Sequence, residues 1–475
     1  MSECSPSDKP IRRLARVTVG FRTPFLVGGG RRDIRSQKGF VRDANGLPAL
    51  PGSSIAGVLR HAFTQLRGQP AAERLFGAVL RDGVADDASR PASRLAVSWG
   101  AIHGADDQPV EGLHPDPASD PVLAAAQSGH LRNHVGIDHR GAAADRRKFD
   151  ETVVGAGHRF SFELLLAGDD ADADEWAALM GLLHWPGLRF GAGSRRGFGA
   201  FDVEVAEAAF DLADPAGYDA FCSLPRALGA RQGLSPWTKA AIAPQPTSCI
   251  RLRGLRAEGP WLFGGGTGQG DEDMVAVAEP MVTWLNGRGS VSAEPVYYLP
   301  GSGIKGVLAH RVAWHFNRLT GIRADGLDDP APHVGSANAA VRALFGEVGG
   351  EQGRGRRGIL MFEDLFLPTA VAADGPTWHV SMDRFTGGAR RGLLFSERPL
   401  AAGALPDYTI TLVIPEGESL SGDVRAALDA TLDDLRRGRL TFGSGGGRGN
   451  GTLRCDTVEW WEWDKGQTVP RGGDA

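Results

Sequence analysis

Two glycine-rich loops that carry arginine offer the clearest chemistry in this chain. The first runs over 191–199 and contains Arg195 and Arg196, and the second runs over 443–451 and contains Arg448. Glycine has no Cβ, so successive backbone amides can point at one anion, and the arginines add positive charge. Neither loop has the spacing of a P-loop or of a dinucleotide fingerprint. A single loop of this kind would be explained as a tight structural turn, but two copies with embedded arginines indicate contact with an RNA backbone.

A second repeated motif would place a helix N-terminus beside hydroxyl groups. Pro-Gly-Ser occurs at 51–53 and again at 300–302, and apolar residues at helical spacing follow each copy. The free amides and the dipole of such a helix attract phosphate. The same hydroxyls could instead simply cap the helix, and both interpretations stay open. The serines concerned are Ser53, Ser54 and Ser302.

These motifs belong to one long duplication. Each copy has three glycines, at 28–30 and 264–266, and continues through Pro-Gly-Ser, Leu-Phe-Gly, a basic hairpin with an aspartate, and the glycine–arginine loop. Five matches in the same order predict two large domains. We therefore expect a first domain at 1–206, a linker at 207–246 that its prolines keep irregular, and a second domain at 247–475.

The elements expected in each copy are strand, helix, strand, strand, helix and strand. In the first copy the opening strand covers 14–21, the first helix follows Pro51, and a hairpin region occupies 135–166. In the second copy the hairpin region covers 380–413. This order is typical of the split βαβ, or ferredoxin-like, arrangement with an antiparallel sheet. The predicted fold class is therefore α+β, with two tandem ferredoxin-like domains and β-hairpin insertions.

Composition and charge limit the classes of function. The 475 residues carry a net charge of −5, which on its own argues mildly against nucleic acid. The cations are clustered, however, as in the loop that holds Arg31, Arg32 and Lys38, so a basic groove can lie on an acidic body. The four cysteines show no zinc spacing, no run of 18 apolar residues occurs, and the first residues form no signal peptide. We expect a cytoplasmic protein with no membrane partner.

Together, the triple glycine, the Pro-Gly-Ser helix, the basic hairpin and the glycine-rich loop resemble the RAMP superfamily of CRISPR–Cas effector subunits. The resemblance covers roughly 12–205 and 248–460. It is strongest for the backbone subunit of type III complexes, and the two fused copies are similar to the double subunits of III-D-like systems. It implies RRM-like domains that bind CRISPR RNA along a protein filament, with hairpin thumbs that break the guide–target duplex. The implied partners in this antiviral system are CRISPR RNA, target RNA and other type III Cas subunits.

The resemblance also assigns roles to residues. Lys305 matches the family's lysine after Pro-Gly-Ser, where the first copy has Ala56. The thumbs and the basic loop would contact RNA through phosphates and bases. For each of these side chains alone, a solvated surface position is the alternative. The residues concerned are Arg31, Arg32, His139, Arg140, Arg147, Arg384, Arg390 and Arg391.

In many members of this family, an acid in the loop after the first strand supports metal-dependent cleavage of the target RNA. The family's aspartate falls near Gln37, so Asp33 is the expected substitute in the first copy. In the second copy the longer loop offers Asp271, Asp273 and Glu279. Asp33 and Asp273 are the expected ligands of Mg²⁺, which would help to activate the attacking 2′-hydroxyl. A solvated acidic loop is the alternative in both copies.

Three other functions stay open at this point. A purely structural scaffold would bind the guide without cleaving a target. An endoribonuclease that processes the repeat RNA would need a His/Tyr/Lys acid–base set, and none recurs in the two copies. A small-molecule enzyme would need a deep apolar pocket between the domains instead of a basic groove.

Overall fold

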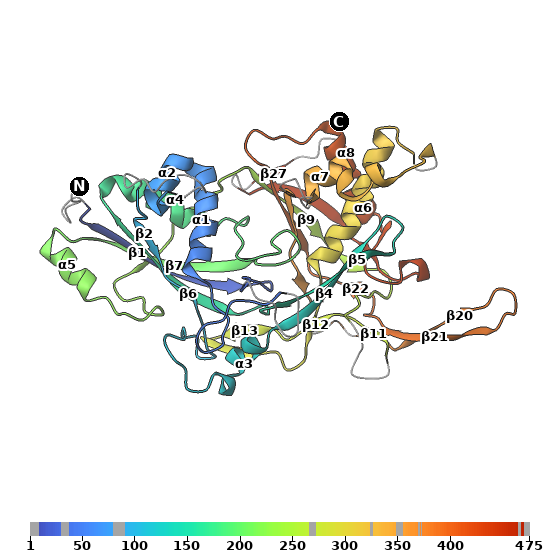
Figure 1. Cartoon of the computed structure of the whole chain (residues 1–475), viewed down its shortest axis with the longest axis horizontal. Coiled ribbons are helices and arrows are strands. Elements are labelled where there is room, and N and C mark those ends of the chain that lie inside the picture. Colours follow the sequence, from blue (N-terminus) through green and yellow to red (C-terminus); the bar gives the residue numbers. More distant parts are fainter. Residues whose placement is uncertain are drawn as a thin grey trace.

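The computed structural model places the two copies next to each other in an elongated molecule, with the first copy on the left of Figure 1 and the second on the right. Each copy has its own sheet and its own buried apolar cluster. The residues that the structure describes are 9–29, 38–78, 91–265, 272–323, 326–347, 355–368, 371 and 373–463, with the backbone of 467–469.

The first unit is built around a central strand, β1. Its main elements in chain order are β1 (Ile11–Phe21), α1 (Gly52–Arg67), β2 (Leu95–Val97), β6 (Arg159–Gly168), α4 (Ala173–Leu183) and β7 (Phe201–Asp211). The strands pair antiparallel in the order β2-β6-β1-β7. The period-two pattern predicted a strand here, and Ala15, Val17 and Val19 are completely buried with apolar side chains of α1 and α4.

The second unit has corresponding elements. They are β9 (Thr247–Arg253), α6 (Gly301–Leu319), β18 (Leu360–Met361), β23 (Tyr408–Val413), α8 (Gly422–Arg436) and β26 (Thr457–Glu462). The strand order is β18-β23-β9-β26, and β27 (Gln467–Val469) adds to the edge next to β26. Matched strand for strand, this is the order of the first unit. The fold class is α+β, as the sequence predicted.

Shorter elements join and flank the two sheets. The remaining helices are α2 (Gln69–Phe76), α3 (Pro121–Ser128), α5 (Pro215–Cys222) and α7 (Ala339–Phe345). The short strands outside the hairpins are β3 (Ala101–Ile102), β8 (Ser235–Pro236), β10 (Arg256–Ala257), β11 (Met274–Val275), β12 (Ala278–Glu279), β13 (Val282–Leu285), β14 (Arg288–Val291), β15 (Val296–Leu299), β16 (Gly346–Glu347), β17 (Arg356–Arg357), β19 (Leu365–Phe366), β22 (Gly403–Ala404), β24 (Leu440–Thr441) and β25 (Thr452–Arg454).

The segment 207–246, which we expected to be an irregular linker, is partly regular. The helix α5 begins at Pro215, and the Asp214 side chain caps it. A proline in the first turn starts a helix instead of breaking one, because its missing N–H has no partner to lose. Backbone carbonyls of this segment also accept hydrogen bonds from Arg16, which is buried in the sheet. The segment therefore packs on the first unit.

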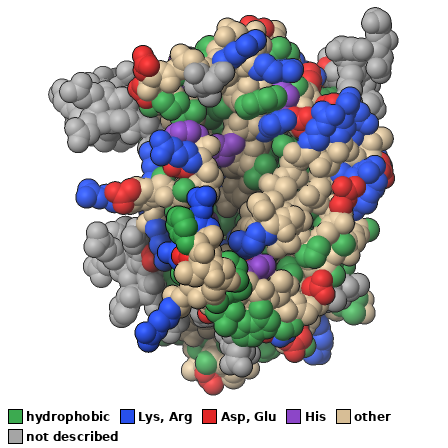
Figure 2. Space-filling model, turned by 90° about the vertical axis from the view of Figure 1, so that its right-hand side faces the viewer, with side chains coloured by type: hydrophobic (Ala, Val, Ile, Leu, Met, Phe, Trp, Pro, Cys, Tyr) green, Lys and Arg blue, Asp and Glu red, His purple; other side chains and the backbone are tan. Residues whose placement is uncertain are grey.

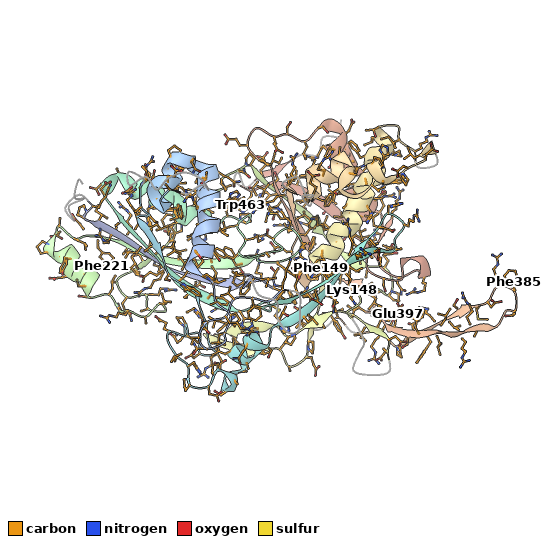
Figure 3. The ribbon with its side chains drawn as sticks, viewed as in Figure 1. Lys148, Phe149, Phe221, Phe385, Glu397 and Trp463 are labelled. Carbon is orange, nitrogen blue, oxygen red and sulfur yellow. The ribbon has the colours of Figure 1, made fainter. Side chains whose placement is uncertain are left out.

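Each unit carries a β-hairpin. The first pairs β4 (His130–Ile137) with β5 (Ala143–Val153), and the second pairs β20 (Thr377–Met382) with β21 (Ala389–Arg398). Both begin a few residues before the predicted regions. In Figure 1 the first hairpin runs along the second unit, whereas the second projects away from the body. Figure 3 labels Phe385 at the outer tip of the projecting hairpin.

A buried charge cluster fixes the first hairpin to the second unit. Arg132 in β4 donates to Glu279 (Nη2 to Oε2, 2.8 Å) and to Asp364 (Nη1 to Oδ2, 3.0 Å). The guanidinium carbon also lies 4.0 Å from the ring centre of Tyr298. Burial opposes the charge on Arg132, but the two carboxylates outweigh it and raise the Arg132 pKa. Arg132 therefore links the two units through a buried ion-pair cluster.

Candidate nucleic-acid interface

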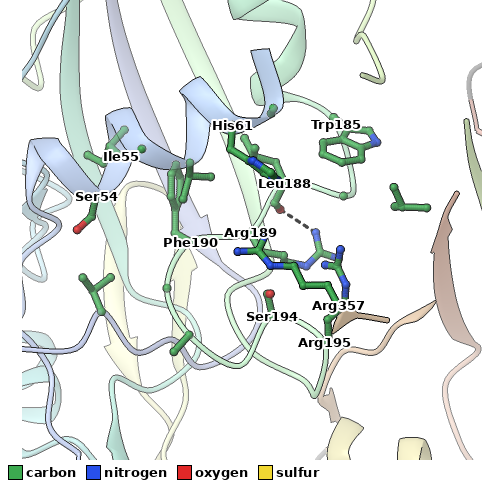
Figure 4. Close-up of a pocket in the computed structure, with 18 of the residues that line it drawn as sticks. Ser54, Ile55, His61, Trp185, Leu188, Arg189, Phe190, Ser194, Arg195 and Arg357 are labelled. Carbon is green, nitrogen blue, oxygen red and sulfur yellow. Dashed lines mark hydrogen bonds between the residues drawn. The ribbon is translucent and has the colours of Figure 1, made fainter. Parts of the chain in front are cut away.

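A cavity of about 610 Å³ lies where the two units meet. Its walls come from the start of α1, from the first glycine–arginine loop, and from the second unit at Arg357 and Val413 (Figure 4). The structure therefore brings together two of the predicted motifs, since Ser53, Ser54 and Arg195 all line this cavity.

The start of α1 offers a free backbone donor beside this cavity. Pro51 occupies the cap position, and its carbonyl accepts from the Ser54 amide at 2.9 Å and from the Ile55 amide at 3.1 Å. Within the part of the chain that the structure describes, no acceptor meets the Ser53 amide. The capping alternative is wrong, because both serines lie inside the first turn and no side chain caps the helix. Both serines line the cavity.

Two arginines bring positive charge to the same cavity. The Arg195 Nε donates to the carbonyl of Gly358 at 2.8 Å. Burial, together with the charges of Arg189 and Arg357, lowers the pKa of Arg195 to about 10. Arg189 is neutralised by Glu363 at 2.6 Å, whereas no ion pair forms at Arg195 or Arg357 among the described residues. The cavity therefore holds positive charge that no internal anion balances.

Two more basic side chains, Lys305 and His61, have pKa values that burial and the nearby arginines lower. Burial, followed by the charges of Arg195 and Arg196, lowers the pKa of Lys305 to about 8, and its Nζ donates to the backbone carbonyl of Phe345 at 3.0 Å. Burial, followed by the charges of Arg357 and Arg195, lowers the pKa of His61. Cations that depress one another's pKa gain free energy when an anion enters between them. An anion placed among these groups would therefore relieve their mutual repulsion.

The corresponding helix start in the second unit is partly occupied by an internal acceptor. The amide of Gly301 donates to Asp364 Oδ1 at 2.7 Å, so an internal carboxylate takes the place of an external anion. Burial raises the pKa of Asp364, and Arg132 supplies the compensating charge. Ser302 is the next residue and is half-buried. The corresponding Gly52 amide in α1 meets no acceptor among the described residues, so the two copies differ at this first amide, while the amides of Ser53 and Ser302 both lack an acceptor there.

A family model for the RAMP superfamily matches residues 18–202 and 255–454, which is most of both units. The chain belongs to the RAMP superfamily. This confirms the resemblance drawn from the repeated motifs and supports a CRISPR-associated, RNA-binding role. No curated protein matches the chain. The helices that the structure describes are too short or too polar to cross a membrane.

The hairpin cations of this RAMP protein are available to a ligand. In the first turn Asp138 accepts from the Arg140 amide at 2.9 Å, and in the second Asp383 accepts from the Thr386 amide at 2.8 Å. These bonds hold the backbone and leave the basic side chains outside. In the view towards the end with the projecting hairpin, Lys and Arg gather around a hollowed surface (Figure 2). The exposed predicted contacts are His139, Arg140, Arg147, Arg384, Arg390 and Arg391.

The neighbouring loop arginines turn to internal partners. Arg196 donates to Glu151 at 2.6 Å, and Arg448 donates to both carboxylate oxygens of Glu397 at 2.6 and 2.7 Å. Sequence analysis did not find these glutamates, because each lies in a hairpin strand, 45 or 51 residues before its arginine. Of the three predicted loop arginines, only Arg195 carries an unpaired charge.

The predicted cleavage acids are placed differently from one another. Asp273 is exposed, and its Oδ2 accepts from the Ser396 amide at 2.8 Å. Glu279 is buried and bound to Arg132. Across the described residues, no group of three or more His, Cys, Asp or Glu side chains is arranged to hold a metal ion. The residues that lie outside the described part are Arg31, Arg32, Asp33 and Asp271.

Proposed function

We propose that this chain is the CRISPR RNA-binding backbone subunit of a type III effector complex, with guide RNA, target RNA and other type III Cas subunits as its partners. The observation that carries the proposal is the group of unbalanced basic side chains beside the open start of α1. The strand orders β2-β6-β1-β7 and β18-β23-β9-β26 support an RRM-like, ferredoxin-like fold for both units.

The junction cavity suits a phosphate of an RNA backbone. Its donors are the Ser53 amide, the hydroxyls of Ser53 and Ser54, and the guanidinium groups of Arg195 and Arg357. They come from both units, so an RNA strand bound there would cross the junction. A small apolar substrate would leave these cations without a partner. The charge of the cavity therefore favours a polyanion over the small-molecule alternative.

RNA binding can be tested with the purified chain and guide-length RNA. Arg195→Met should weaken binding for guides of any spacer sequence and reduce the slope of log K against log salt by about 0.7, the value for one lost single-strand phosphate contact. Arg253→Met is the matched control, because that exposed arginine is already paired with Glu459 at 2.6 Å. If the two variants bind equally well, the cavity is not the RNA site.

Cleavage of guide-complementary RNA is the second part of the proposal. Carboxylate oxygens suit Mg²⁺, and the Asp273 side chain is exposed to solvent. The assembled complex with Mg²⁺ should cleave its target, and Asp33→Ala or Asp273→Ala should each abolish one set of cuts. If every cut persists in both variants, these acids are not the catalytic ones.

A non-catalytic scaffold is the second candidate. The observation that favours it is the buried position of Glu279, whose carboxylate serves the junction with Arg132. An intact target after incubation of the wild-type complex with Mg²⁺ would support the scaffold. Specific cutting of free repeat RNA by the chain alone would instead support a processing endoribonuclease.

A further inference from the structure

A buried glutamate joins the first glycine–arginine loop to the base of the first hairpin. Glu151 in β5 is completely buried, and Arg196 Nη2 lies 2.6 Å from its Oε2. On the facing strand, His134 stacks on Phe149 with ring centres 4.8 Å apart. The Arg196 guanidinium lies over the same phenylalanine, 5.2 Å from its ring centre. Lys38 also reaches Glu151, at 3.5 Å.

The second unit builds the same cluster. Glu397 in β21 is buried, and Arg448 Nη2 donates to both of its oxygens. His379 on the facing strand has its Nε2 3.2 Å from Glu397 and its ring centre 5.0 Å from that of Phe395. Arg448 lies over Phe395 at 5.4 Å. Figure 3 labels Phe149 in the first cluster and Glu397 at the base of the second hairpin.

The two clusters use corresponding positions. In each hairpin the histidine pairs directly with the phenylalanine, and the glutamate follows the phenylalanine by two residues. Both loops also fold alike. The Arg196 and Phe198 amides donate to the Gly193 carbonyl, as the Arg448 and Asn450 amides donate to the Gly445 carbonyl. The same side-chain set has therefore been kept twice in one chain, although the rest of the two hairpins differs.

The charge balance shows what these arginines do. Burial, followed by the charge of Arg196, lowers the pKa of His134 to about 4, so the histidine is neutral near pH 7. The carboxylate of Glu151 is then balanced by Arg196, with the more exposed Lys38 further away. Moving Arg196 onto a phosphate would leave a buried carboxylate without its closest cation, which is strongly unfavourable.

We propose that Arg196 and Arg448 are positioning residues and not phosphate ligands. Each locks its glycine–arginine loop to the hairpin base through Glu151 or Glu397, so that the loop backbone, and in the first unit Arg195, stay directed at the RNA. This inference rests on the proposed RNA-binding function. It assigns opposite roles to the adjacent residues Arg195 and Arg196.

Salt-dependent binding of guide RNA separates the two roles. Arg196→Met and Glu151→Gln should each weaken binding by a factor that does not change with salt concentration, so the slope of log K against log salt stays the same. Arg195→Met should instead reduce that slope by about 0.7. If Arg196 instead contacts phosphate, Glu151→Gln frees it, and binding becomes tighter and the slope steeper. That result, or a reduced slope in Arg196→Met, overturns the inference.

Hydrogen exchange of the RNA-free chain gives a readout that does not depend on RNA binding. Glu151→Gln and Arg196→Met should each speed exchange of the Arg196 and Phe198 amides, whereas Arg196→Lys, which keeps a cation beside Glu151, should retain part of the protection that Arg196→Met loses. Arg448→Met repeats the test at a side chain that is 40% exposed, where failure to fold is less of a concern. Unchanged loop exchange in Glu151→Gln and in Arg448→Met overturns the inference. Arg195→Met should weaken RNA binding and leave loop protection unchanged. If it leaves both unchanged, the proposed function fails, whereas the inference about Arg196 and Arg448 does not.

Discussion

Replacing Arg132 by methionine should weaken the junction between the two units. The guanidinium donates to Glu279 and Asp364, whose side chains are only 7% and 1% exposed. Methionine keeps much of the side-chain volume but leaves two buried carboxylates without their cation. Removing one side of a buried ion pair costs about 3–5 kcal/mol. For a unit of this size, the melting temperature should fall by roughly 6–20 °C.

The loss should depend on pH. Without Arg132, the folded-state pKa of Asp364 rises further above its unfolded value, because burial disfavours the charged form and the nearby cation is gone. A raised pKa gives stability that is present below the unfolded pKa and is lost as the pH rises through the folded pKa. The deficit of the variant is therefore largest near pH 7 and shrinks towards about pH 4. Asp364 already shows this direction, since burial raises its pKa even beside Arg132.

Differential scanning calorimetry at pH 7 and pH 5 measures both effects. The control is Arg253→Met, which breaks an exposed pair with Glu459 and should change stability by less than about 1 kcal/mol. A triple variant that adds Glu279→Gln and Asp364→Asn to Arg132→Met should recover much of the loss, because this cluster then contains no buried charge. Equal melting temperatures for Arg132→Met and Arg253→Met at pH 7 would refute the reasoning.

Three further predictions concern the helix starts and the loops. Gly52→Ala should destabilise the first unit in thermal unfolding, because its Cβ would lie 2.4 Å from the Val97 carbonyl oxygen, whereas Gly57→Ala in the same helix meets open space and should stabilise by about 1 kcal/mol. Binding of RNA near pH 8.5 should take up a proton, since an approaching phosphate raises the lowered pKa of Lys305; calorimetry in two buffers should show the uptake disappear in Lys305→Met. Alanine at Gly197, where a Cβ would meet Asp364 Oδ1 at 2.1 Å, should lower the melting temperature more than alanine at its counterpart Gly449, where an added Cβ would meet nothing within 4 Å. An equal effect at these two glycines would contradict the crowded junction.

Local patterns predicted the regular elements because their signals are short in sequence. The Pro-Gly-Ser motif predicted a helix after Pro51, and α1 begins at Gly52. The period-two pattern likewise predicted the central strand over 14–21, and β1 spans Ile11–Phe21. The prolines of 207–246 were misleading, since Pro215 starts a helix. A proline alone does not show whether a helix begins at it or ends before it.

The site could be predicted only as a set of motifs. Arg195 and Arg196 look equivalent in the sequence, yet one turns to the Gly358 carbonyl and the other to Glu151. The partner of Arg196 lies in a hairpin strand and the partner of Arg195 lies in the other unit, so no local sequence pattern predicts which arginine binds which partner. The pairing of Arg132 with partners 147 and 232 residues away is a property of the assembled fold for the same reason.

The two copies differ most where they meet. Leu50 pairs with Gly100 and Leu299 pairs with Leu365, so Trp99 stands in the first unit where Asp364 stands in the second. Likewise His134 corresponds to His379, which places the uncharged Thr377 at the position of Arg132.

Trp99 is 56% exposed, and Thr377 is exposed too. The outer faces of the chain therefore lack both the cation and this carboxylate of the inner junction. In an end-to-end assembly of chains, the ion pair between Arg132 and Asp364 would have no counterpart at these two positions. In such an assembly, contacts at these faces would depend on other interactions, such as burial of the Trp99 ring.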